Sequence, residues 1–268
     1  MPRAVPPARI LMPRWGACLN VSIHFPIAII LSFRHSFPIM PKHHPYLALI
    51  PAISILLFLV VYVLAAWQYP GGSFMDSTSV GYQFTLNFWC ELLADTAKNG
   101  MPNPGKPIAM VGMVLLCFGL LVFWWLLPIM LQLPSKYRRL VQICGMVSML
   151  LAIFIFTPLH DVVINIAGGF GMVALLGLLV SLYQGRNFAM LATGGGCALM
   201  VLANNFIYHS GYYIEALPVI QKLSFALILG WLLVLDMMLY STLKKAFTSR
   251  VPPFPVSQAR SCKRSSRD

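Results

Sequence analysis

The stretch YLALIPAISILLFLVVYVLAAW, residues 46–67, runs for 22 residues without an Asp, Glu, Lys or Arg. A helix of about 20 apolar residues crosses the hydrocarbon core of a bilayer. Five further apolar runs of similar length follow this one, at about 107–133, 139–159, 162–183, 187–208 and 216–242. The sequence therefore predicts an all-α fold: a polytopic bundle of six transmembrane helices within residues 46–242. Its loops are short except for one longer loop between the first two spans.

Composition supports a membrane protein and excludes several other classes. Hydrophobic residues make up 59% of the chain and charged residues only 10%, whereas soluble domains carry about 25% charged residues. The net charge of +12 is spread over short loops and tails, and a nucleic-acid-binding face would need it clustered. We therefore expect the lipid bilayer as the partner, and no nucleic acid. No motif indicates a cofactor, and the six cysteines lack CxxC spacing, so we predict no disulfide framework.

The loops differ in basic charge, and this difference predicts the orientation. Basic residues accumulate in cytoplasmic loops of membrane proteins. One predicted side carries Lys42, Lys136, Arg138, Arg139, Arg186 and the basic residues after position 242; the other carries Lys98, Lys106 and Lys222. We expect a multi-pass protein of the plasma (inner) membrane with cytoplasmic N and C termini. The loop between spans one and two is then outside.

The two ends of the chain are basic. Within the N-terminal segment 1–45, the apolar stretch 19–33 is short, and as a seventh span it would place three arginines outside. It also lacks the cleavage site of a signal peptide. A start of translation at Met40 is an alternative that intact-mass measurement tests. The tail 243–268 is rich in basic residues, Pro and Ser, so we expect it to be disordered and to meet anionic lipid headgroups.

Polar residues on the predicted outer side are the candidate site. They are Asn87, Glu91, Asp95, His160, Asp161, Asn205, His209 and Glu215. Because the three outer turns face one compartment, these side chains could meet at one mouth of the bundle. His160, His209 and Glu91 are residue types that bind zinc, although no HxxxH or HExxH spacing supports a metal site. The alternative is that these residues are solvated loop and helix-end residues. No catalytic residue is identified.

Three local features carry further expectations. Glu91 and Asp95 are four residues apart, so they would share one face of a short amphipathic helix within 84–97, lying on the bilayer or over the mouth. Asp236 is the most interior acid, and we expect it to be hydrated or paired at the inner interface. The glycine clusters at 167–171 and 193–197 would let spans four and five approach closely.

The longer loop resembles a family of bacterial and archaeal integral membrane proteins with six helices and unknown function. The similarity extends over about 46–242, but its specific part is this loop. The family pattern has a YPGG-like turn, a GY…N segment with an acid, and an NG.PNP-like end. The residues that match are Tyr69, Pro70, Gly71, Gly72, Gly81, Tyr82, Asn87, Glu91, Asn99, Gly100, Asn103 and Pro104. Cys90-Glu91-Leu92-Leu93 replaces the family's Ser-Asp/Glu-Leu-Gly.

A more distant similarity is to the membrane hydrolases that include alkaline ceramidases. Those enzymes hold zinc with Ser, Asp and three His, two of them on the last helix. This chain offers only His160 and His209 on the predicted outer side, and span six has no His.

Three functions follow from these features. The first is a non-enzymatic protein that binds or moves a small molecule or lipid at the outer mouth. The second is a metal-dependent membrane hydrolase that uses Glu91, Asp95, His160, Asp161 and His209. The third is a structural partner of another membrane protein.

Overall fold

The computed structural model describes residues 44–157 and 159–248. The expectations for the N-terminal segment, for a start at Met40 and for the tail beyond residue 248 lie outside the described residues. Within them, the predicted all-α bundle is confirmed. The six long helices are α1 (Leu49–Trp67), α2 (Lys106–Leu126), α3 (Ser135–Ala152), α4 (His160–Gln184), α5 (Phe188–Ser210) and α6 (Leu217–Thr248).

All six helices are long and apolar enough to cross a membrane, so the chain is a multi-pass membrane protein. With their flanking turns they are 22 to 35 residues long. A lipid-embedded segment must satisfy its backbone hydrogen bonds internally, which is why uncharged apolar runs of this length form helices. In the described residues, extended pairing is limited to two isolated bridges, Gly71–Val80 and Thr96–Pro102.

Short 3-10 turns lie next to the long helices, except for the turn Trp89–Leu93, which lies within the loop between α1 and α2. They are η2 (Pro45–Ala48), η3 (Trp89–Leu93), η4 (Leu127–Ile129), η5 (Ile153–Phe156) and η6 (Ile214–Ala216). The predicted spans agree with the helices to within four residues, except at three C-terminal ends. The predicted ends 133 and 159 lie beyond the ends of α2 at Leu126 and of α3 at Ala152, and α6 runs past its predicted end at 242. There residues 243–248, which we expected in the disordered tail, continue the helix. Lys244 and Lys245 are good helix formers, and their charge is favourable at a helix C-terminus.

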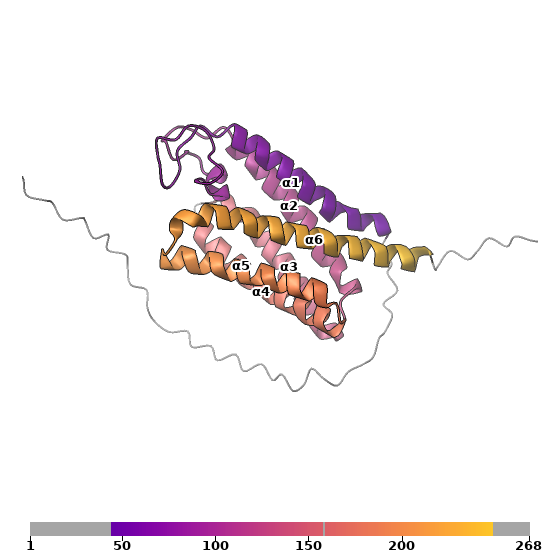
Figure 1. The fold of residues 1–268 in the computed structure, drawn as a ribbon. Coiled ribbons are helices and arrows are strands. Elements are labelled where there is room, and N and C mark those ends of the chain that lie inside the picture. The colour runs from indigo at the N-terminus through magenta and orange to yellow at the C-terminus, as the bar shows by residue number, and fades with distance from the viewer. Residues whose placement is uncertain (1–43, 158, 249–268) are drawn as a thin grey trace, which may run out of the picture. The chain divides into compact units, whose positions relative to one another are not determined.

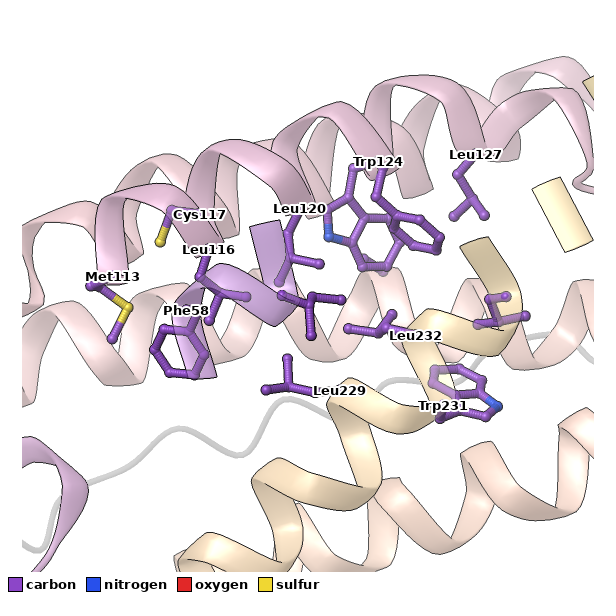
Figure 2. Close-up of a cluster of buried hydrophobic side chains, with 14 of the residues drawn as sticks. Phe58, Met113, Leu116, Cys117, Leu120, Trp124, Leu127, Leu229, Trp231 and Leu232 are labelled. Carbon is purple, nitrogen blue, oxygen red and sulfur yellow. The ribbon is translucent and has the colours of Figure 1, made fainter. Parts of the chain in front are cut away.

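The helices form a closed series of contacts. Each packs against its neighbours in the sequence, and α6 returns to contact α1 as well as α5. In Figure 1, α6 accordingly lies between α1 and α5. Side chains of α1, α2 and α6 meet in the apolar core, where Phe58 lies near Leu116 and Leu229 (Figure 2). Span six is therefore the element that closes the bundle.

The helices differ in how much of their surface is covered. In α2, 56% of the most apolar window is buried, against 17% in α4 and 11% in α5. Large apolar side chains such as Leu176, Leu199 and Phe206 are exposed on these two helices. Apolar surface of this kind is compatible with a membrane environment, because lipid tails are as apolar as the side chains.

Candidate functional site

The first loop, residues 68–105, joins α1 to α2 and contains η3. It lies at the end of the bundle where α5 ends and α6 begins (Figure 1), and we call this the loop end. Its first turn depends on glycine: Gly72 has a φ of +79°, and a Cβ there would collide with the backbone of Lys98 and Asn99. The YPGG stretch therefore brings the start of the loop against its later part.

Asn87 joins three parts of the loop. Its Nδ2 donates to the carbonyl of Gly72 (2.6 Å) and to Oε2 of Glu91 (2.5 Å). Its Oδ1 accepts from the backbone N–H of Gln83 (2.7 Å). The side chain is fully buried, so these bonds form away from water, where an unmade hydrogen bond is costly.

Asn103 also joins separate parts of the loop, at its C-terminal end. Its Nδ2 donates to the carbonyls of Leu92 (3.1 Å) and Ala94 (3.0 Å), at the end of η3. Its Oδ1 accepts from the backbone N–H of Gly105 (3.0 Å), the residue before α2. The two asparagines thus hold η3 between the first turn of the loop and the start of α2.

Glu91 is buried within this network, with 5% of its surface exposed. Oε2 is bonded to Asn87, whereas Oε1 is buried without a hydrogen-bond partner among the described residues. Burial raises the pKa of the Glu91 carboxyl, and the bond from Asn87, the charge of Lys98, the backbone N–H of Phe88 and the charge of Lys222 oppose that rise. One carboxyl oxygen therefore remains available to a ligand or a proton.

Lys222, in the second turn of α6, reaches into the loop. Its Nζ donates to the carbonyls of Asn87 (2.5 Å) and Pro218 (3.1 Å), and only 4% of the residue is exposed. The ammonium also lies 5.5 Å from the ring centre of Tyr82 and 5.0 Å from that of Phe84, within range of a cation–π interaction. A charged residue of span six therefore fixes the loop to the bundle.

Trp89 strengthens the same attachment. Its backbone N–H donates to Oε1 of Gln221 in α6 (3.0 Å). Its ring packs against Phe58 and Tyr62 of α1 and Phe225 of α6, with centroids 5.8, 5.5 and 5.1 Å apart. The loop therefore covers the loop end of α1 and α6 with an aromatic side chain beside the polar network.

The expectation that Glu91 and Asp95 share a helical face is wrong. Helical structure in 84–97 is limited to the 3-10 turn Trp89–Leu93, and Ala94 is already extended. Glu91 points inward, whereas Asp95 is exposed and paired with Nζ of Lys106 (2.5 Å). Asn103 accounts for the difference, because its bonds to Leu92 and Ala94 end the turn before Asp95.

The remaining candidates lie at the loop end but have contacts of their own. Nδ1 of His160 lies 3.1 Å from Oδ1 of its neighbour Asp161, and Asn205 bonds the carbonyl of Val201 in its own helix. His209 packs on the ring of Tyr208. Glu215 is exposed on η6 and lines a surface hollow of about 400 Å³.

These side chains do not assemble into a metal site. In residues 44–157 and 159–248, no group of three or more His, Cys, Asp and Glu side chains could hold a metal ion. The weak metal candidates His160, His209 and Glu91 are therefore not brought together as a ligand set.

Sequence reasoning missed the residues that tie the loop to α6. In the sequence, Lys222 was used only as one of the basic residues that predict the orientation, and Gln221 was not considered. Asn103 entered only through the resemblance. The available signal was a lysine early in an otherwise apolar run, because ionisable residues near membrane helices are costly and usually have a specific partner.

No family model, curated protein or solved structure matches the chain. The resemblance of the first loop to an uncharacterised family of membrane proteins therefore stays a prediction.

Proposed function

We propose that this membrane protein binds or moves a small molecule or a lipid at the loop end, with Glu91 and Lys222 as the contact groups. The observation that carries the proposal is that Oε1 of Glu91 is buried and meets no hydrogen-bond partner within residues 44–157 and 159–248. Buried carboxyl oxygens are nearly always hydrogen-bonded, so an exception needs an explanation. A ligand that donates to this oxygen supplies one.

A purely structural role would not require an acid at position 91. The bond from Asn87 reaches only one oxygen of Glu91, and a glutamine would accept it equally well without the cost of burying a charge. The acid therefore supports a role in recognition rather than in holding the loop together.

Lys222 complements Glu91 with the opposite charge. An ammonium has three donors, and the carbonyls of Asn87 and Pro218 take two of them. The two groups together suit a zwitterion, whose ammonium would donate to Glu91 and whose anionic oxygen would accept from Lys222. Phosphatidylethanolamine carries both groups in one headgroup, as small amino acids do.

The proposal includes the orientation that the loop charges predict. With both termini cytoplasmic, the first loop faces the outside of the plasma membrane, and the ligand reaches Glu91 from there or from the outer leaflet. The exposed apolar surface of α4 and α5 supports contact with lipid along the sides of the bundle.

The test compares ligands that differ in one donor group. Full-length protein in detergent is unfolded thermally with added phosphatidylethanolamine, with phosphatidylcholine of the same acyl chains, or with glycine. For a ligand at about 100 times its Kd, the midpoint should rise by roughly 5–10 °C. We expect this rise with phosphatidylethanolamine or glycine, and not with phosphatidylcholine, whose headgroup has no N–H donor.

The control variants separate Glu91 from general effects of charge. Glu91→Gln should lose the ligand-dependent rise, whereas Asp95→Asn, which changes an exposed acid of the same loop, should keep it. Equal stabilisation of the wild type by all three compounds, or an unchanged response in Glu91→Gln, contradicts the proposal.

A further inference from the structure

Asp236 is a second buried acid, far from the first loop. It lies in the C-terminal half of α6 and is fully buried. Leu232, Leu235 and Leu239 of the same helix are buried around it, and the backbone of Ala52, near the start of α1, faces its carboxyl group. The acid therefore lies in the contact between α6 and α1, inside the membrane-spanning part.

In the described part of the chain no side chain bonds or pairs with the carboxyl group, and the backbone N–H of Ala52 is the polar group that faces it. Both Oδ1 and Oδ2 are buried without a hydrogen bond, and no ion pair involves them. The expectation that Asp236 is hydrated or paired at the inner interface is therefore wrong. The reason is that α1 packs over this face of α6.

The elements packed against α6 offer no positive charge at this depth. α1 and η2 contain no Lys, Arg or His, and α5 has only His209, at its loop end. Glu91 and Cys90 of η3 and Glu215 of η6 also lie at the loop end. On α6 itself, Lys222 is 14 residues from Asp236, or about 21 Å along the helix. Tyr240 is one turn after Asp236. Lys244 and Lys245 follow Tyr240 and are exposed.

An ionised carboxylate that has only the backbone N–H of Ala52 beside it and no counter-charge is very unfavourable in such surroundings, and a neutral acid is not. A metal cation would need several oxygen ligands, whereas leucine side chains and a helical backbone surround this acid. We propose that Asp236 is a proton-binding site within the membrane, neutral when α1 and α6 are packed together. Release of its proton requires α1 to move away from α6, so protonation is coupled to the packing of span one on span six.

This site is separate from the one formed by Glu91 and Lys222 and does not depend on the function proposed for it. His44 packs on the ring of Phe247 with centroids 5.0 Å apart, so the start of α1 and the end of α6 meet at the end opposite the first loop. Asp236 is about 18 Å from the end of α6 at Thr248. Proton exchange at Asp236 is therefore expected from that end.

Dicyclohexylcarbodiimide, an apolar reagent that modifies protonated carboxyl groups, tests the proposal. The carboxyl proton moves to a nitrogen of the reagent, the carboxyl oxygen bonds to its central carbon, and rearrangement gives an N-acylurea that contains the whole reagent. Full-length protein in liposomes is treated at several pH values and mapped by peptide mass spectrometry. We expect the adduct at Asp236, decreasing as the pH rises; Asp236→Glu should keep an adduct at this position and Asp236→Asn should lose it.

Controls and a second measurement make the test decisive. Glu91→Gln should keep the adduct at Asp236, which separates the two buried acids. Infrared spectra at neutral pH should show the carbonyl band of a protonated carboxyl that is missing in Asp236→Asn, whether or not the reagent reaches the site. Identical spectra overturn the proposal. Loss of the adduct when sodium chloride replaces choline chloride at constant pH also overturns it, because the site would then bind a metal cation.

Discussion

Asn87 is the residue on which the conformation of the first loop depends most. Its side chain contacts Gly72, Gln83 and Glu91, and its carbonyl accepts from Lys222. A change of the side chain therefore affects the start of the loop, the segment before η3 and the acid at the proposed site together. Residues with several buried bonds of this kind usually cannot be replaced without a large loss of stability.

Replacing Asn87 by alanine should destabilise the protein by about 2–4 kcal/mol, because Gly72, Gln83 and Glu91 each lose a buried partner. Thermal unfolding in detergent, followed by tryptophan fluorescence, measures the change. Asn205→Ala is the matched control, since Asn205 is exposed and bonds only its own helix; its effect should stay within about 0.5 kcal/mol. Equal effects of the two substitutions would show that the loop network contributes little.

At the scale of the helices, single glycines set the close approaches. Gly145 of α3 lies against the indole ring of Trp124 in α2. Of the two glycine clusters, Gly171 faces Ser148 of α3, while Gly194 faces Trp231 of α6 and Leu179 of α4. Gly168, Gly169, Gly195 and Gly196 have open space beside them. The clusters therefore pack α4 on α3 and α5 on α6 more than they join α4 to α5.

Gly145→Ala should destabilise the bundle by about 1–3 kcal/mol. The new methyl group overlaps the Cγ and Cδ2 atoms of the Trp124 indole, and this part of the side chain, close to the backbone, cannot move aside easily. Gly168→Ala is the control: it is also helical, but no atom beyond its chain neighbours and its own helix backbone lies within 4 Å of the added methyl. The control should be neutral or slightly stabilising, since alanine is the better helix former. Chemical or thermal unfolding of the two variants in the same detergent compares them directly, and a loss of stability in both would refute the packing argument.

At the scale of the whole molecule, the distribution of basic residues predicts the orientation. Arg138 lies in the first turn of α3, at the end of the bundle opposite the first loop. Asp76 lies in the first loop and is exposed. The two positions therefore report on opposite sides of the membrane.

A membrane-impermeant thiol reagent added to intact cells should label Asp76→Cys and leave Arg138→Cys unlabelled, because the first loop is expected outside. The native protein is the background control; Cys117, Cys144 and Cys197 are buried in the helices. Permeabilised cells should show labelling at both positions. Labelling of position 138 alone in intact cells would reverse the orientation.

The number, type and approximate limits of the helices follow from the sequence because each depends on one continuous run. A run such as 46–67 has no charge to place in lipid, and only a helix satisfies its backbone there. Asn87 and Glu91 were also recognisable as candidates, since a polar segment stands out in an apolar chain. Asp95 was assigned to the wrong face because a spacing of four assumes a regular helix, and Asn103 ends the turn early.

The environment of the candidate residues depends on contacts between distant parts of the chain. Lys222 bonds a carbonyl 135 residues away, and the burial of Asp236 depends on α1, which lies far earlier in the chain. Hydropathy describes each span separately and carries no information about which span covers another. The helices are thus readable from local composition, whereas the burial of Glu91, Lys222 and Asp236 follows from how α6 packs against α1 and the first loop.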